Sequence, residues 1–154
     1  MAEVCKALHP GTKVYALDTY EGMPAVDTTR DAHRAGNFSD TGYEELKTVI
    51  ARTGLDNLEL VRGRFEDTSD ELLKRVGKVR LVHVDCDIYS AVVYSYDVTI
   101  PYMVDGGYWA FDDALYSSCI GAMEAVEEAV VQRDRRFSEQ SWPHLVYRNL
   151  PPAG

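Results

Sequence analysis

The stretch RLVHVDCD, residues 80–87, is the clearest indicator of the fold. Leucine and valine dominate its first five residues, which predicts a buried strand over Arg80–Val84. The strand is followed at once by two acids, Asp85 and Asp87. A helix predicted over Ser90–Val104 comes next, so this part of the chain has the strand-to-helix order typical of parallel α/β sheets.

The same alternation of helices and strands extends to both sides of this stretch. Glycine or a Pro-Gly pair follows several of the predicted helices, as expected where a helix ends. The helices are expected at residues 2–8, Tyr43–Thr53, Asp70–Val76, Ser90–Val104 and Ser118–Arg133, and the strands at Lys13–Leu17, Leu58–Arg62, Arg80–Val84 and Tyr108–Phe111. Arg136–Trp142 and His144–Asn149 are expected to close the fold as an antiparallel hairpin. The prediction is an α/β fold with a mainly parallel sheet and helices on both faces.

One long segment, residues 21–40, has no apolar periodicity. Long irregular loops in compact domains are usually functional or disordered. We therefore expect residues 21–40 to be a mobile lid over the strand ends. The whole chain, residues 1–154, is long enough for one hydrophobic core and is predicted to form a single domain.

Charge and cysteine content exclude several classes of function. With 25 acidic against 16 basic residues the net charge is −9, which disfavours nucleic acid and anionic membranes as partners. Cys5, Cys86 and Cys119 are widely spaced and form no C-x-x-C pair, so neither disulfides nor a structural zinc site is indicated. No apolar run approaches the ~20 residues of a spanning helix. We expect a cytoplasmic protein.

Acidic side chains recur where the predicted strands end. In open α/β sheets ligands bind outside the carboxyl ends of the strands, so these carboxylates are expected to converge at one edge. They are Asp18, Asp85, Asp87, Asp112 and Asp113. Repulsion between neighbouring anions can be relieved by Mg²⁺, Ca²⁺ or Mn²⁺, for which Asp85, Asp112 and Asp113 are the candidate ligands. Alternatively, these acids serve only as helix caps and turn residues.

Five linked motifs resemble the macrocin O-methyltransferase family over nearly the whole chain from Val14 to about Arg133. In order they are DTYEGMP (18–24), VRGRFEDT (61–68), HVDCDIYSA (83–91), DGGYWAFDD (105–113) and CIGAMEAVEE (119–128). The resemblance implies a Rossmann-like class I methyltransferase fold with S-adenosylmethionine and Mg²⁺ as cofactors. It also implies methylation of a hydroxyl on a deoxysugar of a small natural product.

The resemblance assigns roles to individual residues. It implies that Asp85, Asp112 and Asp113 are the Mg²⁺ ligands and that Asp85 is also the general base. It places Asp18 near the ribose of the cofactor, and Arg64 and Phe65 near the adenine. Asp87 and Tyr89 belong to the same motif as Asp85, without separable roles.

One departure concerns the start of the family's fold. Its first strand and glycine-rich turn would lie upstream of Ala2, and no G-x-G-x-x-G occurs in the chain. The chain is thus expected to be an N-terminally truncated domain without the segment that holds the methionine part of the cofactor. The missing strand would lie between Lys13–Leu17 and Arg80–Val84. The chain is then a fragment, or the two edges pair directly, or another subunit fills the gap; exposed edges favour a homo-oligomer.

Other interpretations of the acids and their neighbours remain open. Asp85-x-Asp87 after a strand also suits a Mg²⁺-dependent haloacid-dehalogenase-like phosphatase, although the residues around it fit that family poorly. A non-catalytic scaffold derived from a methyltransferase is a third possibility. We expect His83 to be a hydrogen-bonded core imidazole and Cys86, between two acids, to be a poor nucleophile. Residues 66–68 are expected to begin a helix.

Overall fold

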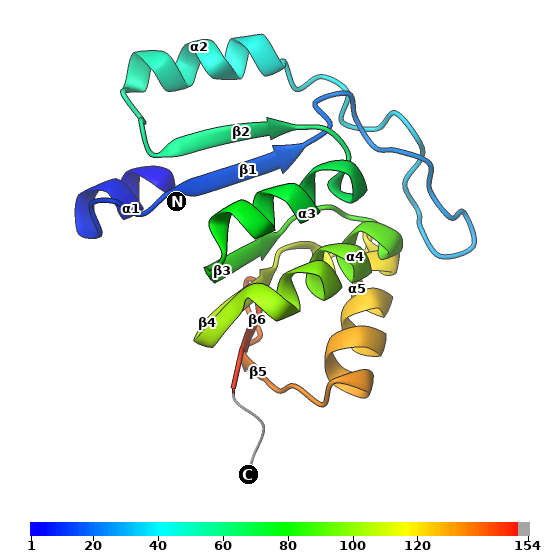
Figure 1. Ribbon diagram of the computed structural model, residues 1–154. Coiled ribbons are helices and arrows are strands. Elements are labelled where there is room, and N and C mark those ends of the chain that lie inside the picture. Colours follow the sequence, from blue (N-terminus) through cyan, green and yellow to red (C-terminus); the bar gives the residue numbers. More distant parts are fainter. Residues whose placement is uncertain (151–154) are drawn as a thin grey trace. The chain divides into compact units, whose positions relative to one another are not determined.

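Residues 1–150 of a computed structural model are described, and residues 151–154 of the domain expected over 1–154 lie outside them. The chain divides into two compact units. Figure 1 shows their helices and strands. The first comprises Met1–Pro24 and Gly36–Thr68, and the second comprises Ala25–Ala35 and Ser69–Gly154.

The first unit contains a two-stranded parallel sheet. Its elements are α1 (Ala2–Leu8), β1 (Val14–Asp18), α2 (Tyr43–Thr53), β2 (Leu58–Arg62) and the start of α3 (Phe65–Val76). Strands β1 and β2 pair in register from Val14 opposite Leu58 to Asp18 opposite Arg62. Helix α2 ends at Gly54, whose φ of +67° suits a residue without a side chain. The predictions for α1, α2 and β2 are confirmed to the residue. Helix α3 is longer than the predicted Asp70–Val76, because it already begins at Phe65, next to the acidic residues 66–68 expected to start a helix.

The second unit contains a four-stranded mixed sheet in the order β3-β4-β6-β5. Its elements are β3 (Val79–Val84), α4 (Tyr89–Thr99), β4 (Met103–Phe111), α5 (Ile120–Ala125), a π-helical segment (Val126–Arg133), β5 (Ser138–Gln140) and β6 (Leu145–Arg148). Short 3₁₀ turns lie at Ile100–Tyr102 and Asp113–Leu115. Strand β4 pairs parallel with β3 and antiparallel with β6, and β5 completes the expected hairpin.

The helix predicted over Ser90–Val104 ends earlier than expected. Helix α4 stops at Thr99, and the chain passes through the 3₁₀ turn Ile100–Tyr102 into β4. Pro101 explains the early end, because proline has no N–H to donate and restricts the residue before it. Met103 and Val104 therefore belong to a strand.

The Asp105-Gly106-Gly107 run lies inside β4, although we expected it to separate a helix from a strand. The pairing of β3 with β4 is irregular at this point, between the Val79–Met103 and Leu81–Tyr108 pairs. Gly106, with φ of +74°, provides the local bend. Its N–H donates to Asn149 O at 2.7 Å, so the bend is still hydrogen-bonded to the end of the β6 region.

The amphipathic helix expected over Ser118–Arg133 is present but begins at Ile120 and changes its hydrogen bonding after Ala125. The segment Val126–Arg133 is π-helical. Strand β5 is shorter than the predicted Arg136–Trp142. Within residues 1–150, no helix is long and apolar enough to span a membrane.

Strands β1 and β3 belong to two different sheets. One of the three arrangements expected for a chain without the family's first strand was direct pairing of β1 with β3. This pairing is not found between the strands described. The parallel pairs β1–β2 and β3–β4 otherwise match the expected mainly parallel arrangement.

Aromatic side chains of β4 form the centre of the second unit's core. Trp109 and Phe111 are 0% and 1% exposed, and Tyr96 of α4 packs edge-on against Trp109 with ring centroids 5.1 Å apart. Alanines and valines of α5 and the π-helical segment complete the cluster. Helix α5 and the π-helical segment therefore bury their apolar sides in the same core cluster as Trp109 and Phe111 of β4.

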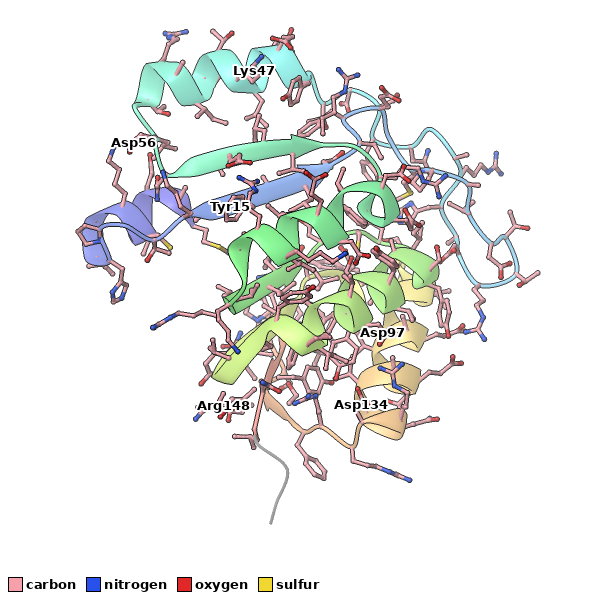
Figure 2. The ribbon with its side chains drawn as sticks, viewed as in Figure 1. Tyr15, Lys47, Asp56, Asp97, Asp134 and Arg148 are labelled. Carbon is pink, nitrogen blue, oxygen red and sulfur yellow. The ribbon has the colours of Figure 1, made fainter. Side chains whose placement is uncertain are left out.

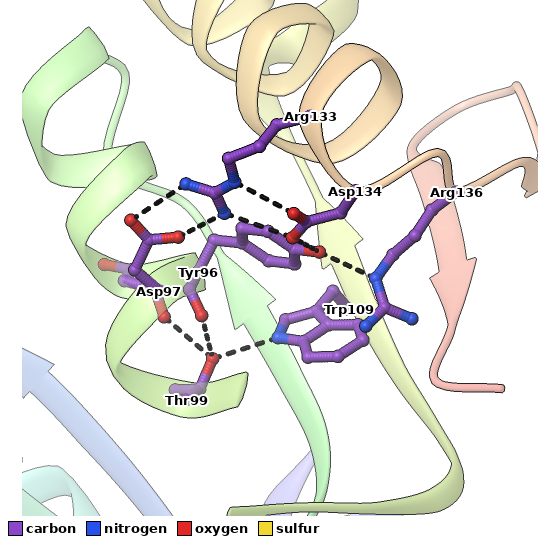
Figure 3. Close-up of polar contacts among 8 residues, drawn as sticks. Tyr96, Asp97, Thr99, Trp109, Arg133, Asp134 and Arg136 are labelled. Atoms are coloured by element: carbon purple, nitrogen blue, oxygen red, sulfur yellow. Dashed lines mark hydrogen bonds and ion pairs between the residues drawn. The ribbon is translucent and has the colours of Figure 1, made fainter. Parts of the chain in front are cut away.

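A polar network joins the far ends of these elements (Figure 3). The Tyr96 hydroxyl donates to Asp134 Oδ2 at 2.8 Å and accepts from Arg136 Nε at 2.7 Å. Arg133 bridges Asp134 and Asp97, which come from different elements (Figures 2 and 3). Burial raises the pKa of Tyr96, and its hydrogen bond to Asp134 adds to the effect, so the hydroxyl remains a donor. The network fixes the π-helical segment against α4.

Tyr96→Phe should lower the free energy of unfolding by about 1–2 kcal/mol, because it removes the hydroxyl that both Asp134 and Arg136 contact. Urea denaturation followed by circular dichroism measures the change. Tyr116→Phe is the matched control, since Tyr116 is 47% exposed. Equal stability of the Tyr96 and Tyr116 variants would show that the network contributes nothing.

Candidate site at the carboxyl end of strands β3 and β4

Three carboxylates meet where β3 and β4 end. Asp85 follows the last residue of β3, and Asp112 follows the last residue of β4. The parallel register places Val84 opposite Phe111, and Asp112 N–H continues the pairing by donating to Val84 O at 2.9 Å. Asp85, Asp112 and Asp113 can each offer an oxygen within 4.8 Å of the others. We call these three residues the acid trio.

Asp113 is the buried member of the acid trio, with 7% exposure. Its Oδ2 accepts the N–H groups of Cys86 and Asp87 at 3.1 and 3.0 Å. Burial raises the pKa of Asp113 to about 6; the Asp87 N–H partly offsets this, and the neighbouring carboxylates add to the rise. A positive charge at this point would relieve both the burial cost and the repulsion.

Part of the expected lid is attached to the second unit. Asp31, 7% exposed, accepts the N–H of Tyr89 through Oδ1 at 2.8 Å and therefore caps the start of α4. Gly121 makes room for this carboxylate, since a Cβ there would overlap Asp31 Oδ1. Residues 25–35 are thus held beside the turn between β3 and α4, which carries Asp85 and Asp87. The expected mobility of the lid stays a prediction.

Tyr89 contacts residues of the loop and of the π-helical segment, a role that the sequence motif did not predict. Its hydroxyl donates to Glu128 Oε2 at 2.6 Å, and the guanidinium of Arg30 lies over its ring at 4.0 Å. Arg30 also pairs with Glu124 and Glu128. Tyr89 therefore connects the loop to α4 and the π-helical segment, and its spacing in the sequence gave no signal of this.

The backbone N–H of Asp87 bonds to Asp113 of the acid trio, but the Asp87 side chain contacts residues outside the trio. Its Oδ1 accepts from Cys119 Sγ at 3.3 Å and lies 3.8 Å from His33 Nε2. Its φ of +58° is uncommon for a residue with a side chain and marks a sharp turn after β3. Of the five acids expected to converge, Asp85, Asp112 and Asp113 form the acid trio. Asp87 adjoins Asp113 but contacts Cys119 and His33 with its side chain, and Asp18 belongs to the first unit.

The two thiols near the acids are poor nucleophiles. Burial, with Asp113 as the next cause, raises the pKa of Cys86, which agrees with the sequence-based expectation. Burial also raises the pKa of Cys119 to about 11.

Two histidines lie beside Asp112, and this was not predicted. His83 is not a core residue: its side chain is 35% exposed, and its Nε2 lies 3.7 Å from Asp112 Oδ1. Alternation along β3 explains this, because His83 is on the face opposite the buried Val84. His144 Nδ1 lies 2.6 Å from the same oxygen. Only the pairing of β6 with β4 brings His144 there, so the sequence held no local signal for it.

The residues assigned to the cofactor lie in the first unit, at one edge of the β1–β2 sheet. Asp18 is the exposed last residue of β1, and Arg64 and Phe65 come after Gly63, the residue that follows β2. Gly63 N–H donates to Asp18 O at 2.9 Å, which holds the ends of the two strands together. Gly63 has φ of +145°, and a Cβ there would come within 2.7 Å of Thr68 Cγ2, so this turn requires glycine.

Asp18 and Arg64 each make a local contact at this edge. Asp18 Oδ1 accepts Tyr20 N–H at 2.6 Å. Arg64 is 56% exposed and lies 3.5 Å from Glu66. Arg64 is exposed and Phe65 is half-buried, and the assignment of these residues to the cofactor stays a prediction.

Comparisons with solved structures place this architecture among methyltransferases. The structure of CalS11, a calicheamicin methyltransferase, matches with a TM-score of 0.81 at 20% identity, covering 96% of this chain and 65% of that one. The O-methyltransferase NovP matches with a TM-score of 0.82 at 20% identity, covering 98% and 66%. The apo structure of CalS11, a TDP-rhamnose 3'-O-methyltransferase, matches with a TM-score of 0.70 at 19% identity, covering 96% of this chain and 63% of that one. The chain spans less than two thirds of each of these proteins.

These matches confirm the predicted α/β Rossmann-like methyltransferase fold. No curated protein sequence matches the chain significantly. A family described as a methyltransferase domain matches residues 1–114, and none of these comparisons points to a phosphatase. The more specific macrocin family stays a prediction. Because the family match covers most of its length, the chain belongs to the methyltransferase domain family.

Proposed function

We propose that this chain carries the metal-binding and part of the cofactor-binding machinery of an S-adenosylmethionine-dependent O-methyltransferase. The proposed substrate is a sugar hydroxyl of a small natural product. The acid trio is the observation that carries the proposal. The family match supports methyl transfer. The name of one structural neighbour, a TDP-rhamnose 3'-O-methyltransferase, supports a sugar as the substrate class.

The donor set of the acid trio fits a hard divalent cation. Its three residues offer only carboxylate oxygens, and one of them, Asp113, is buried at an energetic cost. Carboxylate oxygens are the ligands that Mg²⁺ prefers. Bound Mg²⁺ would hold neighbouring sugar hydroxyls and lower the pKa of the one to be methylated.

Burial distinguishes the proposed roles within the acid trio. Asp113 is fixed by two backbone N–H groups and serves as the rigid ligand. Asp85 is the exposed member, so its carboxylate can reach a substrate from solvent and is proposed to accept the hydroxyl proton. Asp112 lies between them in exposure and completes the donor set.

Cofactor recognition is proposed for the edge of the first unit. Asp18 would accept hydrogen bonds from ribose hydroxyls, and Arg64 and Phe65 would contact the adenine. S-adenosylmethionine supplies the methyl group, and its transfer depends chiefly on alignment with the acceptor oxygen.

Asp113→Asn should stabilise the metal-free protein by on the order of 2 kcal/mol at pH 8, because it replaces a buried anion with a neutral isostere. The folded carboxyl keeps its proton to higher pH than the unfolded one. Unfolding free energy of the unmodified chain should therefore fall as pH rises from about 4 to about 6, and the variant should lack this fall.

Denaturation in chelator and in Mg²⁺ measures both effects. Mg²⁺ should stabilise the unmodified chain and leave Asp113→Asn unchanged. Asp105→Asn, an exposed acid on β4, is the control and should respond to Mg²⁺ normally. Equal stabilisation of Asp113→Asn by Mg²⁺ would contradict the proposed ligand set.

Asp85→Asn should lower methyl transfer by about 10²–10⁴-fold or more, because it removes the proposed base and one of the three proposed Mg²⁺ ligands. Labelled S-adenosylmethionine with a panel of deoxysugar conjugates measures transfer, with Asp105→Asn again as control. A variant that keeps full activity would exclude Asp85 from catalysis, and loss on Asp87→Asn instead would assign the base to Asp87.

Asp18→Asn should weaken binding of S-adenosylhomocysteine at least about tenfold, since the amide accepts ribose hydroxyls less strongly than the carboxylate. Isothermal titration of the full chain gives the affinity, and Asp40→Asn, an exposed acid in the first unit, is the control. Unchanged affinity in Asp18→Asn would remove this residue from the cofactor site.

A further inference from the structure

A second group of ligand-type side chains lies beside the acid trio and differs from it in chemistry. His83, Asp112 and His144 can each offer one ligand atom, and these atoms lie within 4.8 Å of one another. Two imidazoles and one carboxylate are a donor set of borderline softness. Such sets favour zinc and its transition-metal neighbours over Mg²⁺. We call these three residues the histidine pair site.

The sheet itself assembles the histidine pair site. His83 of β3 is opposite Ala110 of β4, which is opposite Val146 of β6. Side chains two residues apart on a strand share a face, so Asp112 follows Ala110 and His144 precedes Val146 on that same face. The small Ala110 leaves room between the two imidazoles, whose ring centroids are 5.8 Å apart.

His144 brings a ring nitrogen directly against Asp112. Its Nδ1 is buried and lies 2.6 Å from Asp112 Oδ1, where a proton or a metal ion can be shared between the two atoms. Donor atoms bonded to one ion at ~2.0–2.2 Å do come about 3 Å from each other.

Access to the histidine pair site is open from solvent. The side chains of His83, Asp112 and His144 are 35%, 25% and 32% exposed. An ion can therefore enter without unfolding the sheet, and each ligand is still partly fixed by its strand or strand end.

We propose that His83, Asp112 and His144 bind a zinc-class divalent ion at a site distinct in chemistry from the acid trio. Asp112 belongs to both groups, so an ion held by the histidines also fixes the carboxylate that the acid trio uses. The proposal does not depend on methyl transfer, because its observations are those of the metal-free side chains.

The test is metal binding by the full chain after removal of metals with a chelator. Zn²⁺ titration gives the affinity, and Co²⁺ gives a visible spectrum that reports the ligands. His83→Gln and His144→Gln should each weaken Zn²⁺ binding at least about tenfold, because each removes a ligand. His9→Gln, an exposed histidine on the first unit, is the control and should bind as the unmodified chain does.

Further variants separate this site from its neighbours. Asp85→Asn should lose the response to Mg²⁺ and retain Zn²⁺ binding, which keeps this proposal distinguishable from the acid trio. Urea denaturation midpoints show whether each histidine variant is folded. If a glutamine variant is unfolded, the asparagine variant at the same position, His83→Asn or His144→Asn, is measured in its place.

Two results would overturn the proposal. One is Zn²⁺ affinity unchanged by both histidine substitutions. The other is a Co²⁺ thiolate charge-transfer band that disappears in Cys119→Ser, which would place the ion at His33, Asp87 and Cys119 instead.

Discussion

Parallel pairing of β3 with β4 is the constraint on which the candidate site depends. Its register sets Val84 opposite Phe111, so the residues that follow, Asp85 and Asp112, leave the sheet side by side. The same pairing buries Trp109 and Phe111 beneath α4 and α5. The apolar face and the acidic edge are therefore consequences of one register, and a shift by one residue would expose the aromatic rings and separate the acids.

Carboxylates also hold the backbone of the turn that bears the site. Between the end of β3 and the start of α4, Asp113 accepts two backbone N–H groups and Asp31 accepts a third. Asp31 precedes this turn in the sequence, and Asp113 follows it. The sequence pattern around each acid predicts only a loop residue and a helix cap, yet both side chains hold the turn in place. Asp85 remains exposed at the edge of the turn.

Several carboxylates of the second unit lie around the turn that follows β3. Burial raises the pKa of Asp113, and the neighbouring carboxylates Asp87, Asp85 and Asp112 add to the rise. Arg30 instead pairs with Glu124 and Glu128 on the helical side. Charge at the acid trio is therefore an argument for a bound cation, and the imidazoles of His83 and His144 widen the range of ions that the same edge can hold.

The sequence by itself determined the elements whose signals are local. Apolar periodicity and terminal glycines predicted α1, α2 and β2 to the residue, and strand-end acids predicted the acid trio. It also indicated the methyltransferase fold, through motifs spread along the chain. Local patterns predicted less well where pairing partners decide the conformation, as at Asp105–Gly107 inside β4 and in the π-helical segment.

Only the tertiary structure decided which distant side chains meet. It joined the Asp87 side chain to Cys119, brought His83 and His144 to Asp112, and attached Asp31 to Tyr89. Each of these contacts joins residues on different strands or loops. The register and direction of strand pairing create such contacts, and neither is encoded in the periodicity of a single segment.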